Sequence, residues 1–459
     1  MTAVLPPAWR SVLPHLGRPM PPDLTPESAG GSAVQVNLPL ELVRQSVLDR
    51  EYWEIPGEVA DAYRRFRPTP LWRATGFERA VGARVPVYVK YEGGNISGSH
   101  KLNTALAQAY YYKRAGIREL VTGTGAGQWG TALAAACALF GLRCRVFMVE
   151  SSLRRKPYRG VLMRMLGAEV HSSPSGLTKI SGKPAEQIGN SLSLAIGEAV
   201  EYAAGHEGAA FSIGSGETYS ILHQSVIGLE AQAQLAEEDA EIDTVVGCVG
   251  AGSNFGGIAL PFFAESAAGG ERPLLVAAES STAPKLTRGV YAYDKTDATG
   301  SGPLEAMYTI GSDYRIPDAH SAGLRFHGAA KVISAMRHSG DIAATAVTQN
   351  DALEAGRLLT LHEGVLPAPE SGHALAAAAR LATDGADGMR ARRGVLVCVS
   401  GHGYLDLAAY EQLLDGELGD EAPDGPALLA AVSGLTPVGA EPGATGPGRT
   451  ALLTTGVRP

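Results

Sequence analysis

The order of apolar segments along this chain predicts an α/β fold, in which a mostly parallel sheet is covered by helices on both faces. Short β-branched runs alternate with longer stretches rich in alanine and leucine, which is typical of strand–helix–strand units. The expected strands are apolar throughout, as strands buried on two sides are. We expect strands at residues 85–91, 119–122, 145–149, 244–249, 274–278 and 394–399. We expect helices at residues 101–115, 127–140, 156–166, 218–237, 351–361 and 370–382.

The two ends of the chain lack this alternation. Residues 1–80 are rich in proline and end near the segment Arg67-Pro68-Thr69-Pro70-Leu71, where each proline disfavours a helix before it. We expect an N-terminal arm over residues 1–80 that packs on the C-terminal lobe. Residues 420–459 are crowded with proline, glycine, alanine and threonine, which predicts a flexible tail.

Composition and charge exclude several classes of protein. The 459 residues carry a formal net charge of −8, whereas binding to nucleic acid requires a clustered excess of basic residues. The longest apolar stretch, residues 131–142, is too short to span a membrane, and the N-terminus lacks the features of a secretory signal. The four cysteines lie in apolar runs without metal-ligand spacing, so neither a metal nor a disulfide framework is expected. We therefore expect a cytoplasmic protein whose partners are small molecules.

The first chemical cluster is Lys101 with the Gly- and Ser-rich loop before it, residues 92–100. The loop follows an expected strand and opens an expected helix, so backbone N–H groups face a loop that a ligand can approach closely. In the first turn of a helix, the dipole and partial burial both lower the pKa of an amine, which suits a lysine that bonds to an aldehyde. A lone lysine is far more often a solvated surface residue, so this interpretation depends on the clusters that accompany it.

Two further glycine-rich loops join an expected strand to an expected helix. Residues 123–130, with four glycines in the sequence Gly-Thr-Gly-Ala-Gly-Gln-Trp-Gly, form a set of N–H donors that could hold a carboxylate. Residues 250–257, Gly-Ala-Gly-Ser-Asn-Phe-Gly-Gly, have the geometry that binds a phosphate at a helix N-terminus. Their glycine spacing differs from G-x-G-x-x-G, so a nicotinamide dehydrogenase is a poor fit.

Two polar positions complete the set. Ser400 ends an expected strand, where its hydroxyl could meet a ring nitrogen or cap the following turn. Glu363 and Glu370 flank a rigid turn, and Glu370 has the place of an ordinary charge at a helix N-terminus. These clusters lie at strand ends, where open α/β sheets bind their ligands. A reactive lysine, a phosphate loop, a carboxylate loop and a hydroxyl together predict pyridoxal phosphate and an amino acid.

With these motifs the chain resembles the tryptophan synthase beta family, in particular its second branch, within fold type II of the pyridoxal phosphate enzymes. The matching stretches are residues 67–71, 98–103, 124–130, 155–159, 162–170, 222–228, 250–254, 324–328 and 363–373. The resemblance implies two lobes, residues 81–215 with Lys101 and the carboxylate loop and residues 216–419 with the phosphate loop. Each lobe would hold a mostly parallel sheet, and the cofactor would lie in the cleft between them. A homodimer is also implied, while a bound monovalent cation and an alpha-type partner are left open.

The resemblance assigns roles to single residues. Lys101 would bond to the cofactor and transfer the α proton, and Ser400 would meet the pyridine nitrogen. The other cofactor-binding residues would be His100, Asn103, Gln128, Gly250, Ala251, Gly252, Ser253, Asn254 and Glu363. The substrate carboxylate would be bound by Thr124, Gly125, Ala126, Gly127, Gln128 and Trp129. A neutral hydroxyl leaves the pyridine nitrogen mostly unprotonated, which favours β-elimination and β-replacement over aminotransfer.

The chain departs from the family at two places. Where the family has its catalytic glutamate, directly before the Thr-Gly-Ala-Gly-Gln string, this chain has Gly123. A general acid or base contributes about 10²- to 10⁴-fold in rate, so its loss puts the synthesis of tryptophan in doubt. Gly123 would also enlarge the pocket of the second substrate. The second departure is Glu217-Thr218-Tyr219, which stands where relatives have an apolar residue followed by Asn-His.

Three functions follow as alternatives. The favoured one is a specialised enzyme of β-elimination or β-replacement, which acts on serine or a β-substituted amino acid and a second small nucleophile. The second is tryptophan synthesis from serine and indole, with Glu217, Tyr219 or water as a substitute acid. The third is a catalytically idle partner protein that binds the cofactor, against which the retention of Lys101 argues.

Overall fold

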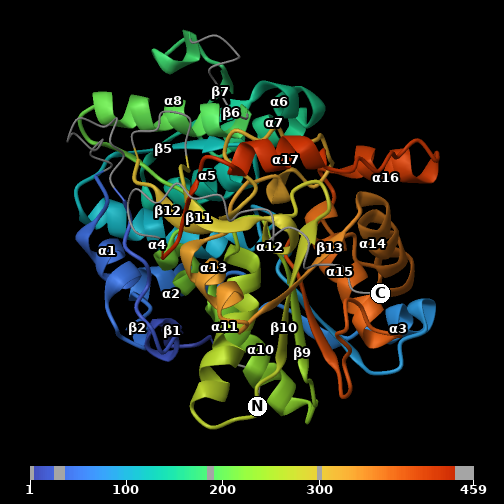
Figure 1. Cartoon of the computed structure of the whole chain (residues 1–459). Coiled ribbons are helices and arrows are strands. Elements are labelled where there is room, and N and C mark those ends of the chain that lie inside the picture. Colours follow the sequence, from blue (N-terminus) through green and yellow to red (C-terminus); the bar gives the residue numbers. More distant parts are fainter. Residues whose placement is uncertain (1–4, 25–36, 183–190, 297–301, 440–459) are drawn as a thin grey trace.

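The computed structural model describes residues 5–24, 37–182, 191–296 and 302–439, which form two main sheets covered by helices (Figure 1). All six expected strands and all expected helices are present, although the helix expected over residues 218–237 is divided at Ser225. The α/β class is confirmed. Within the described ranges, no helix combines the length and apolar character that crossing a membrane requires.

The smaller parallel sheet has the strand order β7-β6-β5-β8. Its strands are β5 (Glu119–Thr124), β6 (Arg143–Val149), β7 (Glu169–Ser173) and β8 (Ala209–Phe211). The helices of this part are α4 (Lys101–Arg114), α5 (Gln128–Phe140), α6 (Glu150–Arg155), α7 (Pro157–Met165) and α8 (Ser191–Gly205). The apolar helix α5 begins after Gly127 and ends at Gly141, whose φ angles are +86° and +70°. Glycine adopts this left-handed conformation without the steric cost that a side chain adds, which fixes both ends of the helix.

The larger sheet has the strand order β13-β10-β9-β14-β4-β3 and is parallel except for the edge strand β3. Its strands are β3 (Leu71–Arg73), β4 (Val87–Tyr91), β9 (Thr244–Cys248), β10 (Leu274–Ser280), β13 (Ala343–Val347) and β14 (Val395–Val399). The helices of this part are α3 (Thr75–Val81), α9 (Thr218–Gln224), α10 (Val226–Glu237), α11 (Ser253–Ala267), α12 (Lys285–Arg288), α13 (Lys331–His338), α14 (Gln349–Glu363), α15 (Pro369–Ala382) and α16 (Leu407–Leu414). The four central strands, β10, β9, β14 and β4, are almost entirely buried, in keeping with their unbroken apolar sequences.

The observed sheets differ from the expected lobe boundaries. β4 belongs by sequence to the range 81–215, yet it pairs with β14 in the larger sheet, and β3 pairs with β4 although it lies in the expected arm. The chain enters the smaller sheet only at β5. Pairing between strands that are about 300 residues apart cannot be inferred from local sequence, which explains the error in the boundary.

The N-terminal arm packs on both parts of the molecule and not on the C-terminal part alone. It contains β1 (Ala8–Arg10), α1 (Leu40–Val47), β2 (Tyr52–Glu54) and α2 (Gly57–Tyr63), and β1 and β2 pair antiparallel. Arg10 forms an ion pair with Glu265 of α11 at 2.7 Å. The Gln45 side-chain amide donates to the Tyr111 hydroxyl of α4 at 3.0 Å. The arm therefore ties α4 to α11.

The expected flexible tail is wrong for residues 420–439. These residues form α17 (Gly425–Val432) and β15 (Thr436–Pro437), and β15 pairs with β11 (Val290–Asp294), which in turn pairs with β12 (Glu305–Thr309). Asp424 caps α17, and Leu428 packs in an apolar cluster with Tyr314 and Ile316. The remaining residues of the expected tail, 440–459, lie outside the described part of the chain.

Candidate active site

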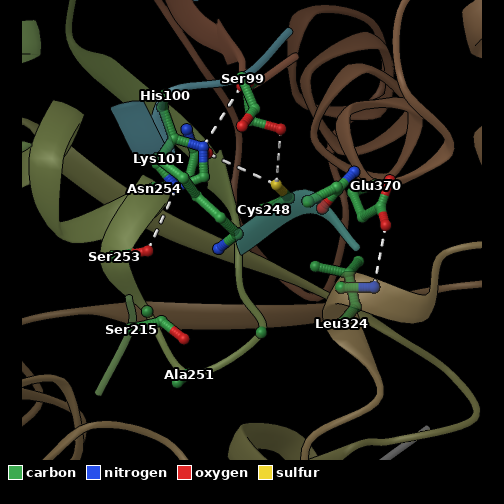
Figure 2. Close-up of a pocket in the computed structure, with 15 residues that line it drawn as sticks. Ser99, His100, Lys101, Ser215, Cys248, Ala251, Ser253, Asn254, Leu324 and Glu370 are labelled. Carbon is green, nitrogen blue, oxygen red and sulfur yellow. Dashed lines mark hydrogen bonds between the residues drawn. The ribbon is translucent and has the colours of Figure 1, made fainter. Parts of the chain in front are cut away.

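A pocket lies where loops from both sheets meet, and it brings most of the predicted cofactor-binding residues together (Figure 2). The empty space within it is about 400 Å³, a volume that includes solvent at its open side. The loops follow the carboxyl ends of β4, β9 and β14, and the start of α5 adds a wall from the smaller sheet. The lining residues are Ser99, His100, Lys101, Gln128, Ser215, Cys248, Gly250, Ala251, Gly252, Ser253, Asn254, Gly323, Leu324, Glu370 and Ser400.

Lys101 is the first residue of α4 and lines this pocket. Burial lowers the pKa of its ammonium group, and the opposing effects of Cys248 and Glu370 are smaller. A lowered pKa increases the fraction of free amine, which is the nucleophilic form. Lys101 carries the one amine among the described side chains that line the pocket.

The phosphate loop faces Lys101 across the pocket, between the end of β9 and the start of α11. Two of its glycines have no room for a side chain. A Cβ on Gly250 would lie 2.2 Å from the Gly323 carbonyl oxygen, and a Cβ on Gly252 would lie 2.7 Å from the Ile333 side chain. Gly252 also has φ of +129°. The first N–H groups of the 15-residue helix α11 have no partner within the helix, so the loop presents free donors to an anion.

His100 links the lysine to the phosphate loop. Its Nε2 lies 3.1 Å from the Ser253 hydroxyl, and its backbone N–H donates to the Ser400 carbonyl at 2.8 Å. Burial, with a further contribution from the charge of Lys101, lowers the pKa of His100 to about 3. The ring is therefore neutral at pH 7 and adds no charge beside the anion site.

Ser400 lies at the end of β14 with its hydroxyl 2.8 Å from the Ser371 hydroxyl and 3.6 Å from the Cys248 sulfur. It lines the same pocket as Lys101 and the phosphate loop. An amine, an anion-binding loop with no room for a Cβ at Gly250 and Gly252, and a neutral hydroxyl are the groups that the aldehyde, the phosphate and the ring nitrogen of pyridoxal phosphate require. The residues present therefore fit this cofactor.

Of the expected carboxylate loop, Gln128 is among the residues that line the pocket, and residues 124–127 and Trp129 are not. Gly127 donates its N–H to the Thr124 hydroxyl at 3.2 Å, which shapes the turn before α5. The Trp129 side chain is not among the lining residues, and it packs elsewhere. Its indole N–H donates to the Thr122 hydroxyl at 2.9 Å, and its ring packs so closely on Gly214 that a Cβ there would lie 2.0 Å away.

The prediction that Glu363 lines the cofactor pocket is wrong. Glu370 lines the pocket instead. The Glu363 carboxylate accepts hydrogen bonds from the N–H of Gly76 at 2.6 Å and of Phe77 at 3.0 Å, so it binds the start of α3. Glu370 accepts from the Gly323 N–H at 2.9 Å through one oxygen. Its other oxygen is buried without a hydrogen-bond partner among the described residues, so it is available to a ligand.

Asn103 lies beneath the pocket and not in it. Its side-chain amide donates to Gln224 at 2.9 Å and accepts from Arg67 at 2.8 Å, within a buried network of charged groups. Asn103 therefore supports the first turn of α4, and no contact with a bound molecule is indicated.

The two expected substitute acids have different surroundings. Tyr219 is buried, and burial raises the pKa of its hydroxyl well above the ordinary value, so it belongs to the core. Glu217 precedes α9, two residues after Ser215 of the pocket wall. Burial raises the pKa of Glu217, an effect that Lys331 opposes and Asp23 strengthens. Burial and the nearby Glu217 also raise the pKa of Glu305 to about 8.

Gly123 does not enlarge the pocket, contrary to expectation. A Cβ at this position would lie 2.4 Å from the backbone of Ala195 and Ile196 in α8. The absence of a side chain allows α8 to pack directly on β5. No side chain at this position could reach the pocket without a shift of α8.

Gly123→Ala is expected to destabilise the protein by about 1–3 kcal/mol, because backbone atoms of α8 must move to accept the methyl group. Urea denaturation of the purified protein measures the effect. Gly57→Ala is a matched control, since a Cβ there meets nothing within 4 Å. Equal stability of the two variants would contradict the packing argument.

Sequence reasoning did not find Ser99, Ser215, Cys248, Gly323 and Leu324, which all line the pocket. Cys248 ends β9 two residues before the phosphate loop, and it could have been found as the next-to-last residue of the strand expected at residues 244–249. Ser215 and the turn at Gly323 carry no local signal, because only the folded chain brings them to the pocket.

Comparisons with known proteins agree with this geometry. Residues 63–401 match the family profile described as pyridoxal-phosphate dependent enzyme. Tryptophan synthase beta chain 2 of Thermococcus kodakarensis is 45% identical over 436 residues, which cover 92% of this chain and 98% of that protein. The tryptophan synthase beta chain of Pyrobaculum islandicum is 49% identical over 385 residues, which cover 83% and 90%.

Two solved structures share the fold at low sequence identity. The fungal L-serine ammonia-lyase of Rhizomucor miehei superposes with a TM-score of 0.57 at 16% identity, covering 76% of this chain and 98% of that one. The T.th. threonine deaminase superposes with a TM-score of 0.55 at 20% identity, covering 75% and 96%.

Proposed function

Because this chain belongs to the tryptophan synthase beta family of pyridoxal-phosphate-dependent enzymes, we propose that it catalyses β-elimination and β-replacement on serine or a β-substituted amino acid. The fold is that of fold type II, and the chain is a pyridoxal-phosphate-dependent lyase or synthase. The observation that carries the proposed reaction is the joint placement of Lys101, the phosphate loop and the neutral Ser400 hydroxyl in one pocket.

Each side of the pocket has a task in this proposal. When bound, pyridoxal phosphate supplies an aldehyde that bonds to amines and a ring that withdraws electrons from the α carbon. Lys101 would hold the cofactor through its amine and, as a free amine, would take the α proton. The N–H groups at Gly250–Asn254 would bind the phosphate, and the neutral Ser400 hydroxyl would face the ring nitrogen. The start of α5, at Gln128, faces the substrate carboxylate.

The departure of the leaving group is the step that distinguishes this chain from its relatives. Hydroxide leaves only with a proton, and position 123 offers no carboxyl to supply one. Acetate or chloride leaves without such help. The proposal therefore favours amino acids with a good β-leaving group.

A panel of substrates tests this proposal on the cofactor-loaded enzyme. L-serine, O-acetyl-L-serine and β-chloro-L-alanine are supplied with and without indole, and pyruvate and new amino acids are measured by chromatography. We expect faster turnover of the two activated substrates than of serine. Equal rates of tryptophan formation from serine and from the activated substrates would contradict specialisation, and no turnover of any substrate would favour the idle partner protein.

Glu217 is the observation that favours the second candidate, the synthesis of tryptophan from serine and indole. Burial raises the pKa of its carboxyl group, which favours the protonated form, and it lies two residues from Ser215 of the pocket wall. A protonated carboxyl at that place can donate to a leaving hydroxyl. Serine would then remain a substrate despite Gly123.

Glu217→Gln is expected to lower turnover of serine by about 10²-fold, because a general acid contributes about 10²- to 10⁴-fold. Turnover of β-chloro-L-alanine is expected to stay unchanged, since chloride leaves without a proton. Steady-state rates for both substrates give the ratio directly. Glu207→Gln, an exposed position, is the control. An equal loss with both substrates would remove Glu217 as the acid and indicate a structural role.

A further inference from the structure

Lys285 is a completely buried lysine whose charge the proposed reaction does not use. It is the first residue of α12, and its side chain turns back into the protein. Its Nζ donates to the Ala283 carbonyl oxygen at 3.2 Å and to the Leu324 carbonyl oxygen at 3.4 Å. A buried ammonium group costs several kcal/mol unless it is paired, so this arrangement has to be compensated nearby.

Glu279 of β10 is the acidic side chain whose charge favours the ammonium form of Lys285. It is completely buried and accepts hydrogen bonds from the Leu286 N–H at 2.9 Å and from the N–H and hydroxyl of Thr287 at 2.9 and 2.6 Å. Burial raises the pKa of Glu279, while Lys285 and these three donors lower it. Burial lowers the pKa of Lys285 to about 8, against the attraction of Glu279. The ammonium form of Lys285 therefore predominates at pH 7.

The carbonyl that Lys285 holds belongs to the pocket wall. Leu324 ends the short turn Ala322–Leu324, and Gly323 and Leu324 both line the pocket. The Gly323 N–H donates to Glu370, and its carbonyl oxygen packs against Gly250 of the phosphate loop. A displacement of this turn would thus disturb both the carboxylate and the phosphate loop.

Backbone carbonyl oxygens that converge on one point are the ligands of a monovalent cation, because they replace its hydration shell. Here the ammonium group of Lys285 already lies between the carbonyl oxygens of Ala283 and Leu324. An ammonium group is a compact unit charge with three donors. We propose that Lys285 is a built-in cation, which holds the turn Ala322–Leu324 in place of a free monovalent ion. The monovalent cation left open by the sequence does not fit here, and the enzyme is independent of Na⁺ and K⁺ at this site.

The proposal is tested by exchanging the salt in which the cofactor-loaded enzyme is kept. The midpoint temperature of thermal unfolding and the turnover rate are measured at pH 7 in tetramethylammonium chloride, NaCl, KCl and NH₄Cl at equal ionic strength. The wild type is expected to give the same midpoint and the same rate in all four salts. A wild type that loses activity in tetramethylammonium chloride and regains it in KCl overturns the proposal without any variant.

Two variants at the same position separate the charge from the space that it fills. Lys285→Ala leaves room for an ion, so K⁺ or NH₄⁺ is expected to raise its thermal midpoint by about 2–4 °C over tetramethylammonium and its turnover severalfold. Lys285→Met fills the room with an apolar chain and is expected to show no such rescue. Lys295→Met, which removes a partly exposed lysine paired with Asp313, is the control. A folded Lys285→Ala protein that ignores K⁺ and NH₄⁺ would overturn the proposal.

These outcomes are independent of the substrate. If turnover is absent with every amino acid tested, the proposed function fails, but the thermal midpoints still report on Lys285. If the midpoints contradict the built-in cation, the pocket at Lys101 is unaffected.

Discussion

Lys101→Ala abolishes turnover of every amino acid substrate in our account. The amine is the only group at the start of α4 that can bond to the cofactor, and it is also the base for the α proton. Loss of the proton transfer alone costs about 10²- to 10⁴-fold in rate, and loss of the covalent bond adds to this. Initial rates of pyruvate formation, with cofactor in excess, measure the effect.

Two further variants make this result specific. Lys101→Arg keeps the charge but offers no nucleophilic amine, so it is expected to be as inactive as the alanine variant. Lys113→Ala removes an exposed lysine near the other end of the same helix and is expected to leave the rate unchanged. Turnover by Lys101→Ala within about tenfold of the wild type would show that another group carries the reaction.

Arg67→Met is expected to destabilise the protein by about 3–5 kcal/mol, the cost of breaking a buried ion pair. All five N–H donors of Arg67 have acceptors: two bonds reach Glu92, two reach Glu230 and one reaches Asn103, at 2.8 to 3.0 Å. Lys90 also binds Glu230 at 3.0 Å. Without the guanidinium, two buried carboxylates share one ammonium group. Urea denaturation of the cofactor-loaded enzyme measures the loss.

A double variant distinguishes the charge from the packing of Arg67. Adding Glu92→Gln to Arg67→Met leaves the Glu230 carboxylate paired with the Lys90 ammonium group, so part of the lost stability is expected to return. Arg64→Met, on the exposed face of the arm, is expected to change stability by less than about 0.5 kcal/mol. If the double variant is less stable than Arg67→Met, unpaired charge is not the cause.

The same network gives a dependence on pH. Burial alone would raise the pKa of Glu92, but Arg67 outweighs it and lowers the pKa from 4.5 to about 2. A carboxyl whose pKa is lowered by folding stabilises the fold above pH 4.5, and this stabilisation is lost as the pH falls towards 2. The wild type is therefore expected to lose more stability over this interval than Arg67→Met does. Equal losses would contradict the lowered pKa.

Local motifs in the sequence sufficed to locate the central part of the pocket. The phosphate loop and Ser400 follow the ends of β9 and β14, and Lys101 follows β4 after the loop 92–100. Parallel strands bring such ends to one edge of the sheet. Their positions depend on residues close to them in the chain. The pocket unites them with Gln128 as expected.

The surroundings of the other site residues could not be predicted, because they depend on segments that are distant in the sequence. Glu363 and Glu370 flank the same turn, and only the docking of α3 decides which of them faces the pocket. Trp129 follows Gln128, but the helix turns its side chain toward Gly214. Gly123 looked like a gap in the pocket, yet the space beside it is filled by α8. In all three cases a distant segment sets the environment of the side chain.

The central claim is that pyridoxal phosphate is bonded to Lys101, and chemical reduction tests it most directly. Borohydride converts the carbon–nitrogen double bond between cofactor and lysine into a stable single bond, so digestion and mass spectrometry then locate the modified peptide. Our account predicts the added mass of the reduced cofactor on the peptide that contains Lys101. Added mass on another lysine, such as Lys90 or Lys285, or on none, would contradict it.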